Sequence, residues 1–100
     1  NKRTEVNTEY SLEQNYPNPF NPSTSISYSI SENSIVKLTV YDMLGREVAS
    51  LVNTQQMSGS YSAVFNASQL SSGVYIYRLD ASPLNGKQGY SDIRRMILIK

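Results

Sequence analysis

Much of the chain follows a strict two-residue alternation of polar and apolar side chains. From Ser25 to Ile30 serine occupies every odd position and Ile or Tyr every even one, and Val36, Leu38 and Val40 resume the period after a short polar loop. A period of two is that of a β-strand with one face in the core and the other in solvent. The alternation therefore predicts half-buried strands.

Further strands follow at intervals typical of a β-sandwich. Residues 42–45 predict a tight turn in which Gly45 takes a positive φ, and a loop rich in Pro, Gly and Asn spans residues 83–89. Additional strands are predicted at 61–65, 73–79 and 92–99. About seven short strands with turns at this spacing predict an all-β fold, an immunoglobulin-like or fibronectin-like antiparallel sandwich.

The segment 46–54 fits two kinds of element. Leu44, Val48, Leu51 and Val52 have the spacing of a helix face. The Gly, Ser, Val and Thr residues around them are poor helix formers, and the neighbouring segments are strands. A strand is therefore favoured, with a helix as the alternative.

The last strand is apolar on both of its faces. Its side chains alternate, with Ile93, Arg95, Ile97 and Ile99 on one face and Arg94, Met96, Leu98 and Lys100 on the other. A mid-strand Arg95 would have to be desolvated in a core, whereas Arg94 and Lys100 lie at the ends of their face and can reach solvent. We therefore expect Met96 and Leu98 to face inward, and Ile97 and Ile99 to be displayed beside Arg95. The alternative is that a loop or the start of the chain covers them.

A proline-rich segment precedes the first long strand. Three prolines between Asn15 and Pro22 favour extended backbone and remove hydrogen-bond donors. This segment is expected to be an edge or a strap across the domain, with Tyr16 and Phe20 as its apolar anchors. Residues 1–11 show no apolar period and are predicted to be a linker, so the domain is assigned to 12–100. Because the chain opens with Asn1 rather than Met, we expect it to be a piece of a longer protein.

The tyrosines suggest both a fold marker and an alternative function. Leu70 to Tyr75 resembles the tyrosine corner of immunoglobulin-like folds, in which a strand-start Tyr bonds backbone a few residues upstream. Strand parity places four tyrosines inward, Tyr28, Tyr61, Tyr75 and Tyr77, and points Tyr41 outward. Outward aromatic rings stack on sugars, so a carbohydrate-binding module is one alternative, and a structural accessory sandwich is another.

The chemistry of most enzymes is missing from the composition. The chain has no histidine and no cysteine, and its carboxylates are scattered through the sequence, Asp42, Glu47, Asp80 and Asp92 among them. We therefore predict no catalytic, metal or cofactor site, and interpret Asp42 as a turn residue that bonds local backbone. A net charge of +1 and the lack of a long apolar run argue against nucleic acid and a membrane span.

Four blocks in order resemble the type A C-terminal sorting domains of the type IX (Por) secretion system. The blocks are residues 12–24, 40–48, 72–79 and 95–100. The family signature residues among them are Asn15, Tyr16, Pro17, Asn18, Pro19, Phe20, Asn21, Pro22, Gly45, Gly73, Tyr75 and Tyr77.

The resemblance implies transport rather than catalysis. It implies an immunoglobulin-like domain that follows a cargo protein and directs it through the periplasm and the outer membrane to the cell surface or beyond. The implied partners are the outer-membrane translocon and its shuttle components, and a sortase-like surface protease that cuts ahead of the domain, within 1–11. We predict that the translocon recognises the last strand through Arg95, Ile97, Ile99 and Lys100, by its face or by strand pairing at its edge.

Overall fold

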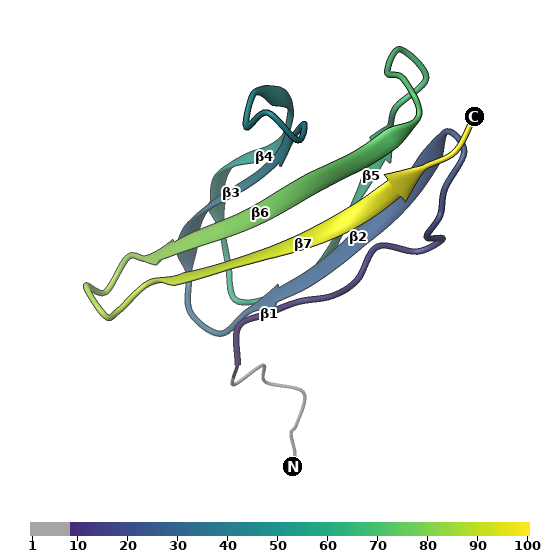
Figure 1. Ribbon diagram of the computed structural model, residues 1–100. Coiled ribbons are helices and arrows are strands. Elements are labelled where there is room, and N and C mark those ends of the chain that lie inside the picture. The colour runs from purple at the N-terminus through teal and green to yellow at the C-terminus, as the bar shows by residue number, and fades with distance from the viewer. Residues whose placement is uncertain (1–8) are drawn as a thin grey trace.

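The computed structural model describes residues 9–100, which form seven strands and no helix (Figure 1). The strands are β1 (Ser11–Leu12), β2 (Ser23–Ile30), β3 (Ser34–Tyr41), β4 (Glu47–Gln56), β5 (Gly59–Asn66), β6 (Gly73–Pro83) and β7 (Tyr90–Leu98). All strand pairs within the sheets are antiparallel. The predicted all-β fold is confirmed.

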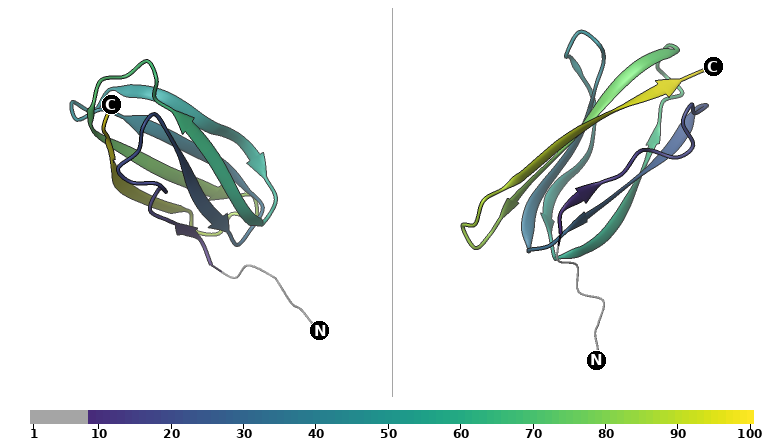
Figure 2. Two further views of the ribbon diagram at one scale, coloured as in Figure 1. Left: turned by 90° about the vertical axis from the view of Figure 1, so that its right-hand side faces the viewer. Right: turned by 60° about the horizontal axis from the view of Figure 1, so that its bottom comes forward.

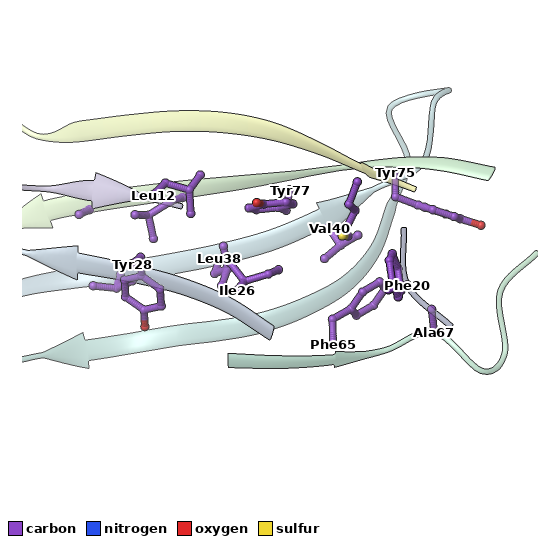
Figure 3. Close-up of a cluster of buried hydrophobic side chains, with 14 of the residues drawn as sticks. Leu12, Phe20, Ile26, Tyr28, Leu38, Val40, Phe65, Ala67, Tyr75 and Tyr77 are labelled. Carbon is purple, nitrogen blue, oxygen red and sulfur yellow. The ribbon is translucent and has the colours of Figure 1, made fainter. Parts of the chain in front are cut away.

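Two sheets pack face to face around one core. One has the strand order β1-β2-β5 and the other β4-β3-β6-β7, and the two layers are visible in the turned views of Figure 2. Figure 3 shows core side chains from both sheets meeting between them, with Phe20 and Phe65 at one end. The result is the predicted antiparallel sandwich of the immunoglobulin-like kind.

The inward faces are those that the alternation predicts. Ile26, Tyr28 and Ile30 of β2 are buried, and Val36, Leu38 and Val40 of β3 are inaccessible to solvent. On β7, Met96 and Leu98 are likewise buried. On β2 and β3 the side-chain period alone sets the inward face, since a shift of one residue would turn each apolar set to solvent. On β7, which is apolar on both faces, the cost of desolvating Arg95 decides which face is inward.

Strand β4 is a strand despite its helix-like spacing, and two β-bulges explain the spacing. Along β3 the register skips one residue of β4 between Leu38 and Thr39 and another between Val40 and Tyr41, which leaves Leu51 and Val48 unpaired. Each extra residue resets the alternation. Val48, Ala49, Leu51 and Val52 therefore all pack partly against the core, in a pattern with a period of neither two nor 3.6.

The tyrosine corner is present at the start of β6. The Tyr75 hydroxyl donates a 2.7 Å hydrogen bond to the carbonyl of Ser71, four residues upstream. This bond fixes the loop that enters β6, the strand that pairs with β7.

The folded part of the described chain begins slightly earlier than predicted. Tyr10 stacks on Tyr90 with ring centroids 5.4 Å apart, its hydroxyl lies 3.1 Å from Ser34 Oγ, and β1 starts at Ser11. Tyr10 and Ser11 therefore contact the sandwich, although the sequence placed them in the linker. In the rest of that predicted linker, Glu9 is exposed, and residues 1–8 lie outside the described residues.

Candidate functional site

The outer face of β7 is an exposed apolar surface with one cation. We define the β7 outer face as Ile93, Arg95, Ile97 and Ile99. All four are exposed, with 41% of Ile97 and 53% of Ile99 accessible to solvent. Covering large aliphatic side chains with a partner lowers the free energy, because it removes apolar surface from water. This face is therefore suited to docking.

Strand β6 widens this surface toward β3. Val74, Ile76 and Arg78 lie opposite Ile97, Arg95 and Ile93 in the register, and Ile76 also lies opposite Tyr41 of β3. Sequence reasoning did not single out Val74 and Ile76 as surface residues. Their outward position could have been predicted from the sequence. Tyr75, Tyr77 and Leu79 were assigned inward, and their neighbours on β6 must point the other way.

Two shallow hollows meet at Ile93. The larger, of about 500 Å³, lies among Gln14, Asn18, Val74, Ile93 and Ile97, and the smaller, of about 220 Å³, is lined by Tyr41, Met43, Ile76, Arg78 and Ile93. The apolar side chains of a partner can fit into these two hollows.

Arg95 brings to this surface a positive charge that is available to a partner. None of the ion pairs within residues 9–100 involves Arg95, whereas Arg78 Nε lies 3.0 Å from Asp80 Oδ1. A partner that brings a carboxylate to Arg95 forms an ion pair without breaking one already present.

The edge of β7 is closed from Arg95 onward. The Phe20 amide donates to the Ile97 carbonyl at 2.9 Å, and the Ile99 amide donates to the Phe20 carbonyl at 3.0 Å. The Ile97 amide donates to Asn18 Oδ1, and Gln14 Nε2 donates to the Arg95 carbonyl. Backbone groups of Arg95, Ile97 and Ile99 at this edge are therefore already bonded, which favours recognition through the face over strand pairing by a partner.

The proline-rich segment is the strap that joins the two sheets, as expected. On the β2 side, Tyr16 and Ser25 exchange two backbone hydrogen bonds of 2.9 and 3.0 Å. On the β7 side, Phe20 forms the bonds given above. The strap thus closes the open side of the sandwich and holds the C-terminal half of β7 in place.

The anchors of the strap are Asn15 and Phe20, so the assignment of Tyr16 as an apolar anchor is wrong. Tyr16 is 81% exposed, whereas Asn15 and Phe20 are buried. Asn15 Nδ2 donates to the Pro17 carbonyl and to Thr24 Oγ1, which satisfies its buried amide. A buried asparagine has no apolar period to mark it, so hydropathy alone could not have found it.

Tyr77 connects the strap to the centre of the core. Its hydroxyl accepts a 2.8 Å bond from the Asn15 amide and donates a 2.7 Å bond to the Glu13 carbonyl. Burial raises the pKa of the Tyr77 phenol, which keeps it neutral and able to donate this bond. The signature residues Asn15 and Tyr77 are thus direct partners across 62 positions of sequence.

Lys100 is separated from the other predicted recognition residues. Its ammonium donates 2.8 Å hydrogen bonds to the carbonyls of Ser68 and Leu70. The charge of Lys100 is therefore engaged by the loop before β6, and only Arg95, Ile97 and Ile99 are brought together on one face.

The turn beside the smaller hollow is organised by Asp42. Its Oδ1 accepts hydrogen bonds from the amides of Leu44 and Arg46, its Oδ2 pairs with Arg46 Nε at 2.8 Å, and Gly45 has a φ of +85°. Both predictions for this turn are confirmed. The bond from the Arg46 amide, above all, holds the pKa of the Asp42 carboxyl below its ordinary value.

An NMR titration is expected to show this turn loosening in acid. Because the folded-state pKa of Asp42 is lowered, its carboxylate supports the turn above the unfolded-state pKa, and that support is lost as pH falls through the folded-state pKa. The amide shifts of Leu44 and Arg46 should titrate with the Asp42 carboxyl, and Asp42→Asn should abolish that step. A step that persists in Asp42→Asn would contradict the assignment.

The tyrosines serve mostly as core residues. Tyr28, Tyr75 and Tyr77 are buried, and Tyr61 is partly buried and stacks on Tyr28 with ring centroids 5.5 Å apart. Tyr41 is half-buried at the smaller hollow. The inward assignment made from strand parity is therefore confirmed for the four rings other than Tyr41.

Residues 9–100 contain neither a metal-binding cluster nor a membrane-spanning helix. This part of the chain holds no group of three or more His, Cys, Asp or Glu side chains arranged to bind a metal ion. It also contains no helix with the length and apolar character needed to cross a membrane.

Comparison with known proteins points to one family and one fold. Residues 14–88 match the family model of the secretion system C-terminal sorting domain. This match covers the strap and the five strands β2 to β6, and it leaves out β1 and β7. No curated protein matches the sequence.

Two solved structures share the fold. CopC from Methylosinus trichosporium OB3b superposes with a TM-score of 0.58 at 11% identity, over 90% of this chain and 93% of CopC. PorZ, an essential bacterial surface component of the type IX secretion system of Porphyromonas gingivalis, gives a TM-score of 0.54 at 21% identity. That match covers 91% of this chain but only 11% of PorZ.

Proposed function

The chain belongs to the family of C-terminal sorting domains of the type IX (Por) secretion system, and we propose that it directs a folded cargo through the type IX machinery across the outer membrane. The observation that carries the proposal is the family match across the strap and five of the seven strands. The cargo is the polypeptide attached ahead of β1.

The geometry supports a signal that is read while folded. The described chain enters beside β1 at one end of the sandwich, and its C-terminus lies at the opposite end (Figure 1). A cargo at the first end leaves the β7 outer face accessible. We propose that the translocon, or a shuttle component that delivers to it, recognises this face through Arg95, Ile97 and Ile99.

Removal of the domain is proposed to follow export. A sortase-like surface protease would cut ahead of Tyr10, because Tyr10 is already packed on Tyr90 and an extended segment is needed to enter a protease cleft. The freed cargo would then be attached to the cell surface or released.

A fusion experiment tests the proposed function. The 100-residue chain, fused behind an inert reporter with a periplasmic leader, is expected to bring the reporter to the surface or medium of a type IX-competent host. In a strain without the translocon the reporter should stay in the periplasm. Retention in the periplasm of both strains, with the domain folded, would contradict the proposal and favour a structural accessory sandwich.

A further inference from the structure

Each sheet of the sandwich has two edges, and three of these four edges are protected. The β1 edge is two residues long, the β7 edge is covered by the strap from Arg95 onward, and the β4 edge carries two bulges. Short strands, coverage and bulges are the usual means by which sheets avoid pairing with other chains.

The fourth edge, β5, carries none of these protections. Strand β5 runs for eight residues in continuous register with β2 and contains no charged residue and no proline. Val64 on its outer face is 67% exposed. A regular, uncharged edge of this length can accept another strand.

The hydrogen-bonding groups that β5 presents follow from the pairing of β2. Ser25 and Ser27 of β2 turn their backbone groups toward the strap and β1, because Ser25 bonds Tyr16 and the Ser27 carbonyl accepts from Glu13. Backbone groups alternate in direction along a strand, so the N–H and C=O groups of Ile26 and Tyr28 point toward β5.

The residues opposite them, Ala63 and Tyr61, therefore use their backbone groups on β2. Ser62 and Val64 must turn theirs to the open edge. Within residues 9–100, no backbone hydrogen bond to Ser62 or Val64 is found outside the strand ladder, and β2 is the only strand that pairs with β5.

We propose that β5 is a self-association edge, which pairs antiparallel with β5 of a second copy of this chain. With Ala63 on the two-fold axis, Ser62 of one copy lies opposite Val64 of the other. These two symmetric pairs exchange four backbone hydrogen bonds. The proposal goes beyond the sorting function and does not depend on it.

Self-pairing in this register brings small and uncharged side chains together at the two-fold axis. The side chains that approach most closely across the axis are the two Ala63 methyl groups, the smallest that a non-hydrogen-bonded pair can offer short of glycine. Tyr61 lies opposite Phe65, an aromatic cross-strand pair. No like charges meet, because β5 has none, and a net charge of +1 gives little long-range repulsion.

Sedimentation of the full wild-type chain and of a proline variant tests whether the β5 edge mediates self-association. Val64→Pro removes the outward amide and leaves the β2 ladder intact, whereas Val64→Thr keeps the amide and the β-branched shape. The wild type and Val64→Thr are expected to show the same monomer–dimer equilibrium. Val64→Pro should raise the dimer dissociation constant at least about tenfold, since two symmetric bonds are lost.

An NMR measurement on the wild type keeps the test independent of whether Val64→Pro folds. In a dimer mixed from isotopically labelled and unlabelled copies, an intermolecular Hα–Hα contact is expected at Ala63. A chain that stays monomeric up to about 1 mM would overturn the proposal. So would a dimer whose contacts lie on β7 or β4, or one that a folded Val64→Pro leaves unchanged.

Discussion

Replacing Phe20 by alanine is expected to lower the free energy of unfolding by about 3–5 kcal/mol. Phe20 is only 2% exposed, and its ring centroid lies 6.0 Å from that of Phe65. Removing the ring leaves a cavity at the point where the strap reaches β7. Because a domain of this size has roughly 5–15 kcal/mol of stability in total, thermal melting should shift down by more than about 10 °C.

Tyr16→Ala is the matched control in the same strap. It removes an aromatic ring of similar size that is 81% exposed, and we expect a change within about 0.5 kcal/mol. Thermal and urea unfolding of the two variants measure the difference. Equal losses for Phe20→Ala and Tyr16→Ala would mean that Phe20 is not the apolar anchor of the strap.

Replacing both Ile97 and Ile99 by threonine is expected to block export while the domain stays folded. Both side chains are about half exposed and belong to the proposed recognition face, so their truncation removes apolar contact with a receptor rather than with the core. Loss of two such contacts predicts a fall in reporter export of at least about tenfold. Reporter in the medium and the melting temperature of the purified domain are measured together.

Ile35→Thr is the control for this double variant. Ile35 is 47% exposed and lies on the outer face of the same sheet, opposite Ser82 and away from β7. Its replacement should leave export unchanged. Normal export by a folded Ile97→Thr/Ile99→Thr variant would mean that the β7 outer face is not what the machinery recognises.

Residues that obey a strict period were predictable from the sequence, and those at irregularities were not. The inward faces of β2 and β3 follow from alternation, whereas Met96 and Leu98 of β7 could be placed in the core because the opposite face would bury the charge of Arg95. Strand β4 could be favoured but not delineated, because the bulges at Val48 and Leu51 depend on pairing with β3 and leave no local mark in the sequence.

The strap shows a second limit of sequence reasoning. Proline content indicated an edge segment. The inward position of Asn15, however, depends on its side-chain bonds to Thr24 and Pro17 and on the bond of its backbone amide to Tyr77, 62 positions away. The same limit applies to Lys100, whose charge is taken by carbonyls of the loop before β6. Long-range polar contacts of this kind have no periodic signature.

In the proposed mechanism, a folded sandwich presents the β7 outer face to the export machinery. The chain has no native cysteine, so single-cysteine variants can be labelled without background. In a reporter fusion arrested at the translocon, Ile97→Cys should be protected from a maleimide. Met57→Cys, at a position between β4 and β5 that is 71% exposed, should react fully. Equal reactivity of the two positions in the arrested complex would contradict the claim.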